Sequence, residues 1–171
     1  IRNGNNTIFL RHNDDDKKNR QALFDSLSLI YDFQSADLSS TTKLSQKGKY
    51  QSEVLALFFK NNRIYFAEVW SSPIARCTET ANYFSENVNA PNWLYLSGFS
   101  DTVESELKKF KNLFYKETPA KNLLIVGHGG FPDYIGVPTN LDKSDFIVYD
   151  KDSQSVILHG TKVSIMDFYS K

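Results

Sequence analysis

The chain of 171 residues has little to build a metal cluster, a polyanion-binding surface or a membrane anchor from. Its single cysteine, Cys77, excludes an internal disulfide and a cysteine-based metal cluster. Its 20 basic and 20 acidic side chains cancel to a formal net charge of zero, which argues against nucleic acid as the main partner. No apolar run approaches the ~20 residues that a membrane-spanning helix needs. Any positive field must therefore be local, built from a few arginines.

The sequence begins with Ile1 instead of methionine. Either a signal peptide has been removed or the sequence begins inside a longer chain. A periplasmic or secreted location and a cytoplasmic one therefore both stay open, as does the oligomeric state.

Apolar residues make up 40% of the chain and aromatic residues 14%, which is enough for one domain spanning residues 1–171 with its own core. Short apolar runs predict strands at residues 7–11, 63–70, 93–96, 123–126, 146–149, 156–159 and 162–168. The most hydrophobic of them, 123–126, is typical of a central parallel strand. Strands alternating with helices predict an α/β fold: a single three-layer domain whose mostly parallel central sheet has helices on both faces.

Helices are predicted where apolar residues recur every three or four positions. One set, after an N-cap at Thr42 or Ser45, is Tyr50, Val54, Leu57 and Phe58. A second set is Ile74, Cys77, Ala81, Phe84 and Val88, and a third is Val103, Leu107, Phe110 and Phe114. The polar stretch 13–43 predicts an excursion with one short helix (Leu23, Leu27, Ile30), and long excursions are often functional.

Histidine occurs only three times, and two of the three follow predicted buried strands. His12 ends the first strand, His128 ends the 123–126 strand, and Ser71-Ser72 follows the strand between them. Ligands of α/β sheets bind beyond the carboxyl ends of the strands, so we expect these three segments to converge on one edge. His159 lies inside a late strand without a glycine-rich turn after it, and we interpret it as structural.

Two arginines accompany the histidines and indicate phosphoryl transfer. Arg11 precedes His12, and Arg76 lies in the first turn of a predicted helix, where a positive charge is disfavoured unless an anion is near. The planar arginine fork binds two phosphate oxygens at once. A neutral imidazole can attack phosphorus and form a phosphohistidine, while a second histidine donates a hydrogen bond. A single histidine after a strand is more often structural, so the combination carries this interpretation.

Four stretches resemble, in order, the signatures of the histidine phosphatase superfamily, which has the phosphoglycerate mutase-like fold. Leu10-Arg11-His12 resembles its RHG motif, and residues 44–51 resemble its LTxxGxxQ helix start. Residues 71–81 are similar to SSPLxRAxETA, with Cys77 in place of the usual alanine, and residues 126–129 are similar to the second-histidine motif. The matches lie within residues 7–130.

The resemblance implies that His12 is the phosphorylated nucleophile. It implies a phosphate pocket of Arg11, His12, Asn13, Arg76, His128 and Gly129, with no metal and no organic cofactor. The partner would be a small phosphorylated substrate or a phosphoprotein. Positive neighbours should lower the pKa of His12, because they disfavour a further proton. The ring nitrogen that does not attack should donate to an acceptor such as a backbone carbonyl, which fixes the tautomer.

The chain departs from the family pattern at two places. Asn13 stands where glycine is usual, and it can adopt a left-handed conformation or reach the phosphate with its amide. The family's general acid is often a glutamate in an LxE pattern, which here is Leu96-Ser97-Gly98. We prefer Asp101 over Glu104 as the acid because it lies closer to the strand end. A site without a strong acid is the other alternative, and a phosphohistidine substrate would not need one.

The short segment between Arg76 and His128 resembles the small phosphatases of the family: bacterial phosphohistidine phosphatases and those acting on the heptose phosphate of lipopolysaccharide core. We therefore expect a metal-independent phosphatase that hydrolyses a phosphomonoester or phosphoramidate through a phosphohistidine. One alternative is a catalytically weak or inactive module of the same fold that binds a phosphorylated ligand, motivated by Asn13 and the missing glutamate. Another is a phosphomutase, against which the short segment argues.

Overall fold

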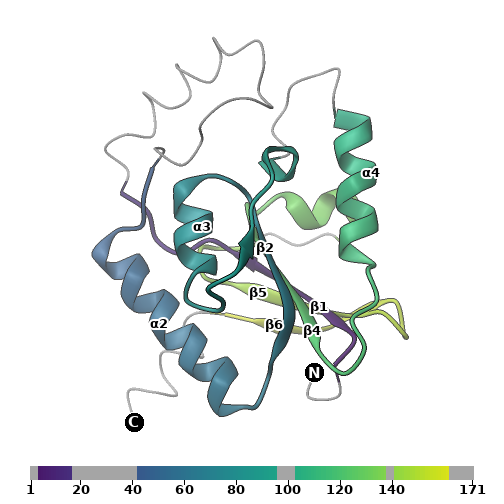
Figure 1. Cartoon of the computed structure of the whole chain (residues 1–171), viewed down its shortest axis with the longest axis horizontal. Helices are drawn as coiled ribbons and strands as arrows, with labels where there is room; N and C mark the ends of the chain where they lie inside the picture. Colours follow the sequence, from purple (N-terminus) through teal and green to yellow (C-terminus); the bar gives the residue numbers. More distant parts are fainter. Residues whose placement is uncertain (1–3, 17–41, 96–102, 138–140, 162–171) are drawn as a thin grey trace.

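The computed structural model describes residues 4–16, 42–95, 103–137 and 141–161 (Figure 1). Within them, six strands form one sheet in the order β3-β2-β4-β1-β5-β6. The strands are β1 (Asn6–Arg11), β2 (Phe66–Ser71), β3 (Val88–Asn89), β4 (Asn122–Gly127), β5 (Phe146–Asp150) and β6 (Ser155–Gly160). The first four in chain order run parallel, and β5 and β6 are antiparallel to their neighbours. The prediction of a mostly parallel sheet is confirmed.

Strand β4 lies inside the sheet, as its sequence predicts. It pairs in parallel with β1 on one side and β2 on the other. All six of its residues are buried, because helices cover both faces of a parallel sheet and leave no side for polar side chains.

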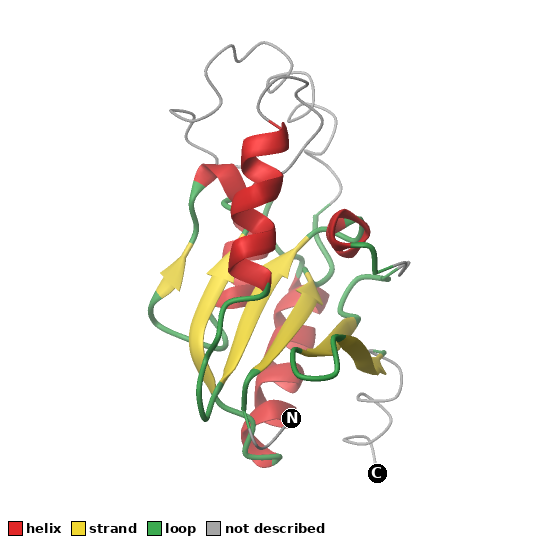
Figure 2. Ribbon diagram, turned by 90° about the vertical axis from the view of Figure 1, so that its right-hand side faces the viewer, coloured by secondary structure: helices red, strands yellow, loops and turns green. Residues whose placement is uncertain are grey.

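Helices lie on both sides of the sheet. Alternate strand residues point to opposite faces, so Ile8 and Leu10 join one hydrophobic cluster while Phe9 joins the other. The first cluster includes side chains from α2 (Gln46–Asn61) and α3 (Ala75–Ala81), and the second from α4 (Val103–Phe114) and the 3₁₀ turns η2 (Asn92–Tyr95) and η3 (Phe131–Ile135). In Figure 2, α4 passes in front of the sheet and α2 lies behind it. The predicted three layers are confirmed, and none of the described helices is long and apolar enough to cross a bilayer.

Helix α2 forms where the sequence predicts it, but it buries a different face. Ser45 is the N-cap, and its hydroxyl accepts a hydrogen bond from the Gly48 amide at 3.0 Å. Tyr50 is 58% exposed and Leu57 is 44% exposed. The buried residues of α2 are Gly48, Gln51, Ser52, Val54, Leu55 and Phe59. Polar residues face inward at the start of α2 because they contact the chain just after β1, which a purely hydrophobic stripe does not anticipate.

Two other element predictions need correction. Helix α3 ends at Ala81, and Val88, predicted on the same helical stripe, belongs to β3 instead. Both Phe84 and Val88 still pack against the same core cluster as α3, so their spacing reflects shared burial. The strand predicted at 93–96 is wrong over residues 93–95, which lie in the 3₁₀ turn η2, and residue 96 lies outside the described residues. The second strand begins at Phe66 rather than at Arg63, which has a positive φ of 58°.

Two predicted elements lie outside the described residues: the helix carrying Leu23, Leu27 and Ile30, and the strand at 162–168. Strands β5 and β6 are confirmed, and residues 151–154 form the turn between them.

Candidate active site

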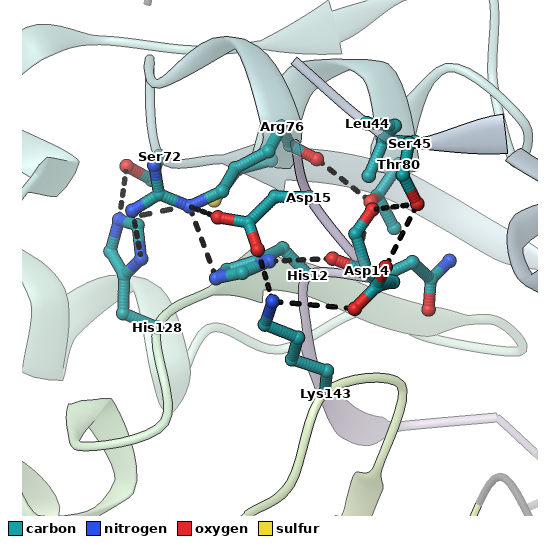
Figure 3. Close-up of polar contacts among 12 residues, drawn as sticks. His12, Asp14, Asp15, Leu44, Ser45, Ser72, Arg76, Thr80, His128 and Lys143 are labelled. Atoms are coloured by element: carbon teal, nitrogen blue, oxygen red, sulfur yellow. Dashed lines mark hydrogen bonds and ion pairs between the residues drawn. The ribbon is translucent and has the colours of Figure 1, made fainter. Parts of the chain in front are cut away.

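The carboxyl ends of β1, β4 and β2 lie side by side, because these strands are parallel neighbours in the sheet. The backbone pairing continues one residue beyond each strand: the His12 amide donates to the Gly127 carbonyl at 3.0 Å, and the Ser72 amide donates to the Val126 carbonyl at 2.9 Å. His128 follows directly after Gly127. The imidazole rings of His12 and His128 lie 5.5 Å apart between centroids, at an angle of 70°. The structure therefore brings the three predicted segments together (Figure 3).

His12 is buried and held in one orientation through both ring nitrogens. Its Nδ1 lies 2.8 Å from the Asn13 carbonyl oxygen, and a carbonyl only accepts, so Nδ1 carries the proton. Its Nε2 accepts a hydrogen bond from Arg76 Nε at 3.1 Å. This tautomer leaves Nε2 as the unprotonated nitrogen that could attack phosphorus.

Burial and positive charge keep the His12 ring neutral. Burial is the larger cause, the Arg76 guanidinium adds to it, and together they lower the pKa of His12 to about 3. The hydrogen bond from Nδ1 to Asn13 and the charge of Asp15 oppose the shift, and Arg11 contributes least. The expected lowering of the pKa is confirmed, although burial outweighs the cationic neighbours from which we expected it.

The guanidinium of Arg76 contacts His12, His128 and Asp15. Arg76 is the second residue of α3, and its side chain is 10% exposed. Its Nε faces both His12 Nε2 and, at 3.8 Å, Asp15 Oδ2, while its Nη2 lies 3.5 Å from His128 Nδ1. Its Nη1 has no hydrogen-bond partner among the described residues. A buried donor left unpaired is costly, so this nitrogen is suited to receive an oxygen from a ligand.

His128 is positioned by Ser72 and by aromatic rings. The Ser72 hydroxyl lies 3.1 Å from His128 Nε2, and the rings of Tyr95 and Phe131 pack edge-on against the imidazole at 5.9 and 5.3 Å. Cys77 Sγ lies 3.9 Å from the same nitrogen. Burial raises the pKa of this thiol to about 12, which makes it a neutral packing partner. The sequence identified the Ser71-Ser72 segment but not the contact of Ser72 with His128.

The side chain of Arg11 packs against the backbone of Gly129. Arg11 Nη1 donates to the carbonyl of Leu141. A Cβ on Gly129 would lie 3.0 Å from this nitrogen and 3.0 Å from the Leu141 oxygen. Glycine at position 129 therefore makes room for the Arg11 side chain, which gives a steric reason for a residue predicted to touch phosphate.

Asn13 has no left-handed backbone conformation, and its side-chain amide is engaged within the chain. It is fully buried and is not among the residues with positive φ, so the left-handed alternative is wrong. Its side-chain amide donates to the Ser52 hydroxyl in α2, and its backbone amide donates to Thr80 Oγ1 at 3.2 Å. Its backbone carbonyl orients His12. In this structure Asn13 ties the end of β1 to α2 and α3.

Three charged residues near His12 were missed by the sequence argument. The Lys143 ammonium pairs with the carboxylate of Asp15 and, at 3.4 Å, with that of Asp14. Partial burial opposes ionisation of Asp14, but the Ser45 hydroxyl and the Lys143 ammonium hold its pKa below the usual value. The side chain of Asp15 is 0% exposed. These carboxylates were interpreted as part of a polar excursion, and their position directly after His12 is the signal that could have revealed them.

The family comparison agrees with the motifs. The model of the histidine phosphatase superfamily (branch 1) matches residues 38–102, which include Arg76 and the start of α2, and the sheet and helices described above match solved structures of this kind. Over these residues the chain is similar to the histidine phosphatase superfamily (branch 1). A search of curated protein sequences found no significant match.

Solved structures of similar fold cover nearly the whole chain at low identity. A protein assigned as the phosphohistidine phosphatase SixA of Agrobacterium tumefaciens is 16% identical, with a TM-score of 0.62 over 92% of this chain and 97% of that one. The α-ribazole phosphatase of Shigella flexneri is 15% identical, with a TM-score of 0.61 over 92% and 96%. Phosphoserine phosphatase of Entamoeba histolytica is 14% identical, with a TM-score of 0.56 over 91% and 96%. At these identities the likeness shows a shared fold.

The remaining candidate residues lie apart from the cluster or outside the described residues. Asp101 and the Leu96-Ser97-Gly98 segment are outside them. Glu104 is exposed in the first turn of α4. His159 lies in β6, where its side chain is 44% exposed and 3.8 Å from Asp145. It is not joined to the His12 and His128 cluster, in agreement with a structural interpretation.

Proposed function

We propose that this chain is a single-domain, metal-independent phosphatase that hydrolyses a phosphomonoester or a phosphoramidate through a phosphohistidine on His12. The observation that carries the proposal is the orientation of His12. Its Nδ1 faces a carbonyl, and its unprotonated Nε2 lies 3.1 Å from the guanidinium of Arg76. A nucleophile beside a phosphate-binding cation is the arrangement that phosphoryl transfer to histidine requires.

In the first step of the proposed reaction, the phosphoryl oxygens bind Arg76 and Arg11, with Arg76 Nη1 the donor that lacks a partner among the described residues. His12 Nε2 attacks phosphorus in line. The N–P bond forms as the bond to the leaving oxygen or nitrogen breaks, and the leaving group departs with the electron pair. His128 donates a hydrogen bond to the transferring group. Water then attacks phosphorus, releases phosphate and restores His12.

The leaving group needs a proton unless it departs easily. Asp101 remains the proposed donor, with Glu104 as the alternative carboxylic acid. Asp101→Asn and Glu104→Gln separate the possibilities. Replacing the residue that acts as the acid should slow turnover of a phosphomonoester with a poor leaving group far more than turnover of p-nitrophenyl phosphate. Equal loss on both substrates would contradict a role as acid.

The central test replaces His12 by alanine. Turnover of p-nitrophenyl phosphate, measured with excess chelator present, should fall by roughly 10³-fold or more, with an unchanged circular dichroism spectrum. Acid-quenched wild-type enzyme should carry a base-stable, acid-labile phosphate that maps to His12, and the variant should carry none. Near-normal activity in the variant, a trapped phosphate elsewhere, or wild-type activity that disappears with chelator would contradict the proposal.

The same assays decide between this proposal and its alternatives. A binding module would take up phosphate or vanadate without measurable turnover on any phosphorylated substrate. A phosphomutase would exchange the phosphoryl group between positions of a phosphoglycerate. Because the similar structures include phosphatases named for phosphohistidine, α-ribazole phosphate and phosphoserine, a panel of small phosphorylated metabolites and phosphoproteins is the appropriate substrate screen.

A further inference from the structure

A carboxylate lies among the cations of the proposed phosphate pocket. Asp15 Oδ2 is 3.8 Å from Arg76 Nε, and its other oxygen pairs with the ammonium of Lys143. The side chain is 0% exposed. Figure 3 shows this carboxylate between Arg76 and Lys143, above the ring of His12. The position of Arg76 in the first turn of a helix predicts an anion nearby, and the structure supplies one from within the chain.

The backbone around Asp15 is anchored by hydrogen bonds, so moving the carboxylate out of the pocket costs free energy. Asp15 forms an isolated antiparallel bridge with Leu44. On one side of it, the Asp16 amide donates to the Lys43 carbonyl at 3.1 Å. On the other side, the Asp14 amide donates to the Gln51 side chain at 3.0 Å. A ligand that binds Arg76 must therefore share the pocket with this negative charge.

The charges of the pocket leave a small positive excess. Among the described residues, three cations, Arg11, Arg76 and Lys143, accompany the carboxylates of Asp14 and Asp15, while His12 is neutral because its pKa is about 3. One net positive charge matches a phosphoryl group that carries one negative charge. A second negative charge on the ligand, a few ångströms from a fixed carboxylate, would weaken binding by roughly one to two powers of ten.

We propose that Asp15 is a specificity-determining residue that makes the pocket prefer a singly charged phosphoryl group over a doubly charged one. This inference rests on the proposed function, because it assigns the anion-binding site to phosphate. The favoured substrates are those whose phosphoryl group keeps a proton or is bonded to a protonated nitrogen. A phosphomonoester dianion, in contrast, would bind only with uptake of a proton.

Calorimetric titration of the full chain with inorganic phosphate between pH 5.5 and 8 tests the inference. Wild-type affinity should fall about tenfold per pH unit once phosphate loses its second proton, and sulfate, which stays doubly charged throughout, should bind weakly at every pH. In Asp15→Asn, both anions should bind at least about tenfold more tightly at pH 8, and the dependence of phosphate binding on pH should disappear. A pH dependence that persists unchanged in this variant would come from another group, such as the retained His128, and would contradict the inference.

Asp14→Asn is the matched control. Asp14 is the adjacent carboxylate and pairs with the same lysine, but its side chain is 32% exposed and water screens its charge. This variant should tighten phosphate binding at pH 8 by much less than Asp15→Asn does, and it should keep most of the wild-type dependence on pH. Lys143→Met provides an independent variant if Asp15→Asn is poorly folded: it leaves the carboxylate of Asp15 without its lysine, so phosphate binding at pH 8 should weaken further.

The outcomes separate the two proposals. If wild type and Asp15→Asn bind phosphate with the same affinity and pH profile, or if wild type binds sulfate as tightly as phosphate at pH 5.5, Asp15 does not select charge and only this inference is wrong. If neither protein binds phosphate at any pH, the proposed function is wrong and the inference with it. Much tighter binding by Asp15→Asn than by Asp14→Asn, with loss of the pH dependence in Asp15→Asn alone, supports it.

Discussion

The buried ring of His12 couples the stability of the protein to pH. Its pKa is about 3 in the folded chain and near 6.5 in an unfolded one. Between these values the unfolded state binds a proton that the folded state does not, so stability is full above pH 6.5 and is lost as pH falls. One such group changes the free energy of unfolding by about 1.4 kcal/mol per pH unit.

We therefore expect the difference in unfolding free energy between wild type and His12→Gln to shrink by about 1.4 kcal/mol for each pH unit from 6 down to 4. Urea unfolding at several pH values measures it. The comparison cancels carboxylates common to both proteins, such as Asp14, whose depressed pKa acts in the same direction. Parallel stability curves for the two proteins would show that His12 is not held neutral by burial.

At the residue scale, the sequence was informative where a side chain has chemistry of its own at a recognisable position. His12, His128 and Arg76 were found because each follows a strand or begins a helix. Lys143 was not, because it reaches the site from a loop 128 residues away from its partner Asp15. Sequence spacing carries no information about such a contact, since only the folded sheet brings the two segments together.

At the scale of the element, Gly48 fixes the approach of α2 to the end of β1. A Cβ at this position would lie 2.0 Å from the Asp14 carbonyl oxygen. Alanine normally stabilises a helix interior relative to glycine by about 0.5–1 kcal/mol. Here we expect Gly48→Ala to destabilise the protein by about 1–3 kcal/mol, because the backbone at Asp14 or in α2 must move to make room for the added methyl group.

Urea midpoints measure this effect, and Gly130→Ala is its control, since a Cβ there meets nothing within 4 Å. The control should change stability by no more than about 0.5 kcal/mol. Gly48→Ala should also lower activity, because Asp14 follows the segment that orients His12. A stabilised Gly48→Ala protein would contradict the packing of α2 described here.

The elements show what periodicity can and cannot predict. Strands β1 and β4 were predicted correctly because short, continuous apolar runs are typical of buried strands. The face of α2 was not, because Gln51 and Ser52 are buried by hydrogen bonds to residues 13 and 14. A polar residue that is satisfied by a neighbouring segment looks solvent-exposed in the sequence, and no helical pattern distinguishes the two cases.

For the whole molecule, binding of an oxyanion should raise the thermal midpoint. A ligand at 100 times its dissociation constant stabilises the folded state by about 2.7 kcal/mol, which corresponds to about 5–10 °C for a chain of this size. Vanadate or phosphate should therefore shift the wild-type midpoint in calorimetry. Arg76→Lys keeps the charge but loses the planar fork, so it should lose most of the shift.

Arg63→Lys is the control for this measurement, because Arg63 is exposed in the turn before β2. It should keep the wild-type shift. An unchanged shift in Arg76→Lys would show that the anion binds elsewhere on the protein.

The three-layer architecture followed from the alternation of strands and helices, but the order of strands within the sheet did not. Strand β1 lies between β4 and β5, and its apolar sequence fits any interior position equally well. What places it there is complementary packing on both faces of the sheet, which involves both hydrophobic clusters.

The position of β1 also has a consequence for how the protein is made. The strand that precedes His12 is synthesised well before β4 and β5, yet it pairs with both, and Asn6 bonds to Asn122, 116 residues later. Such long-range pairing slows folding, because a large loop must close before any contact rewards it. On the ribosome, the first strand must wait until β5 has emerged before both of its edges are paired. The pocket around His12 is therefore assembled only after β5 has been synthesised.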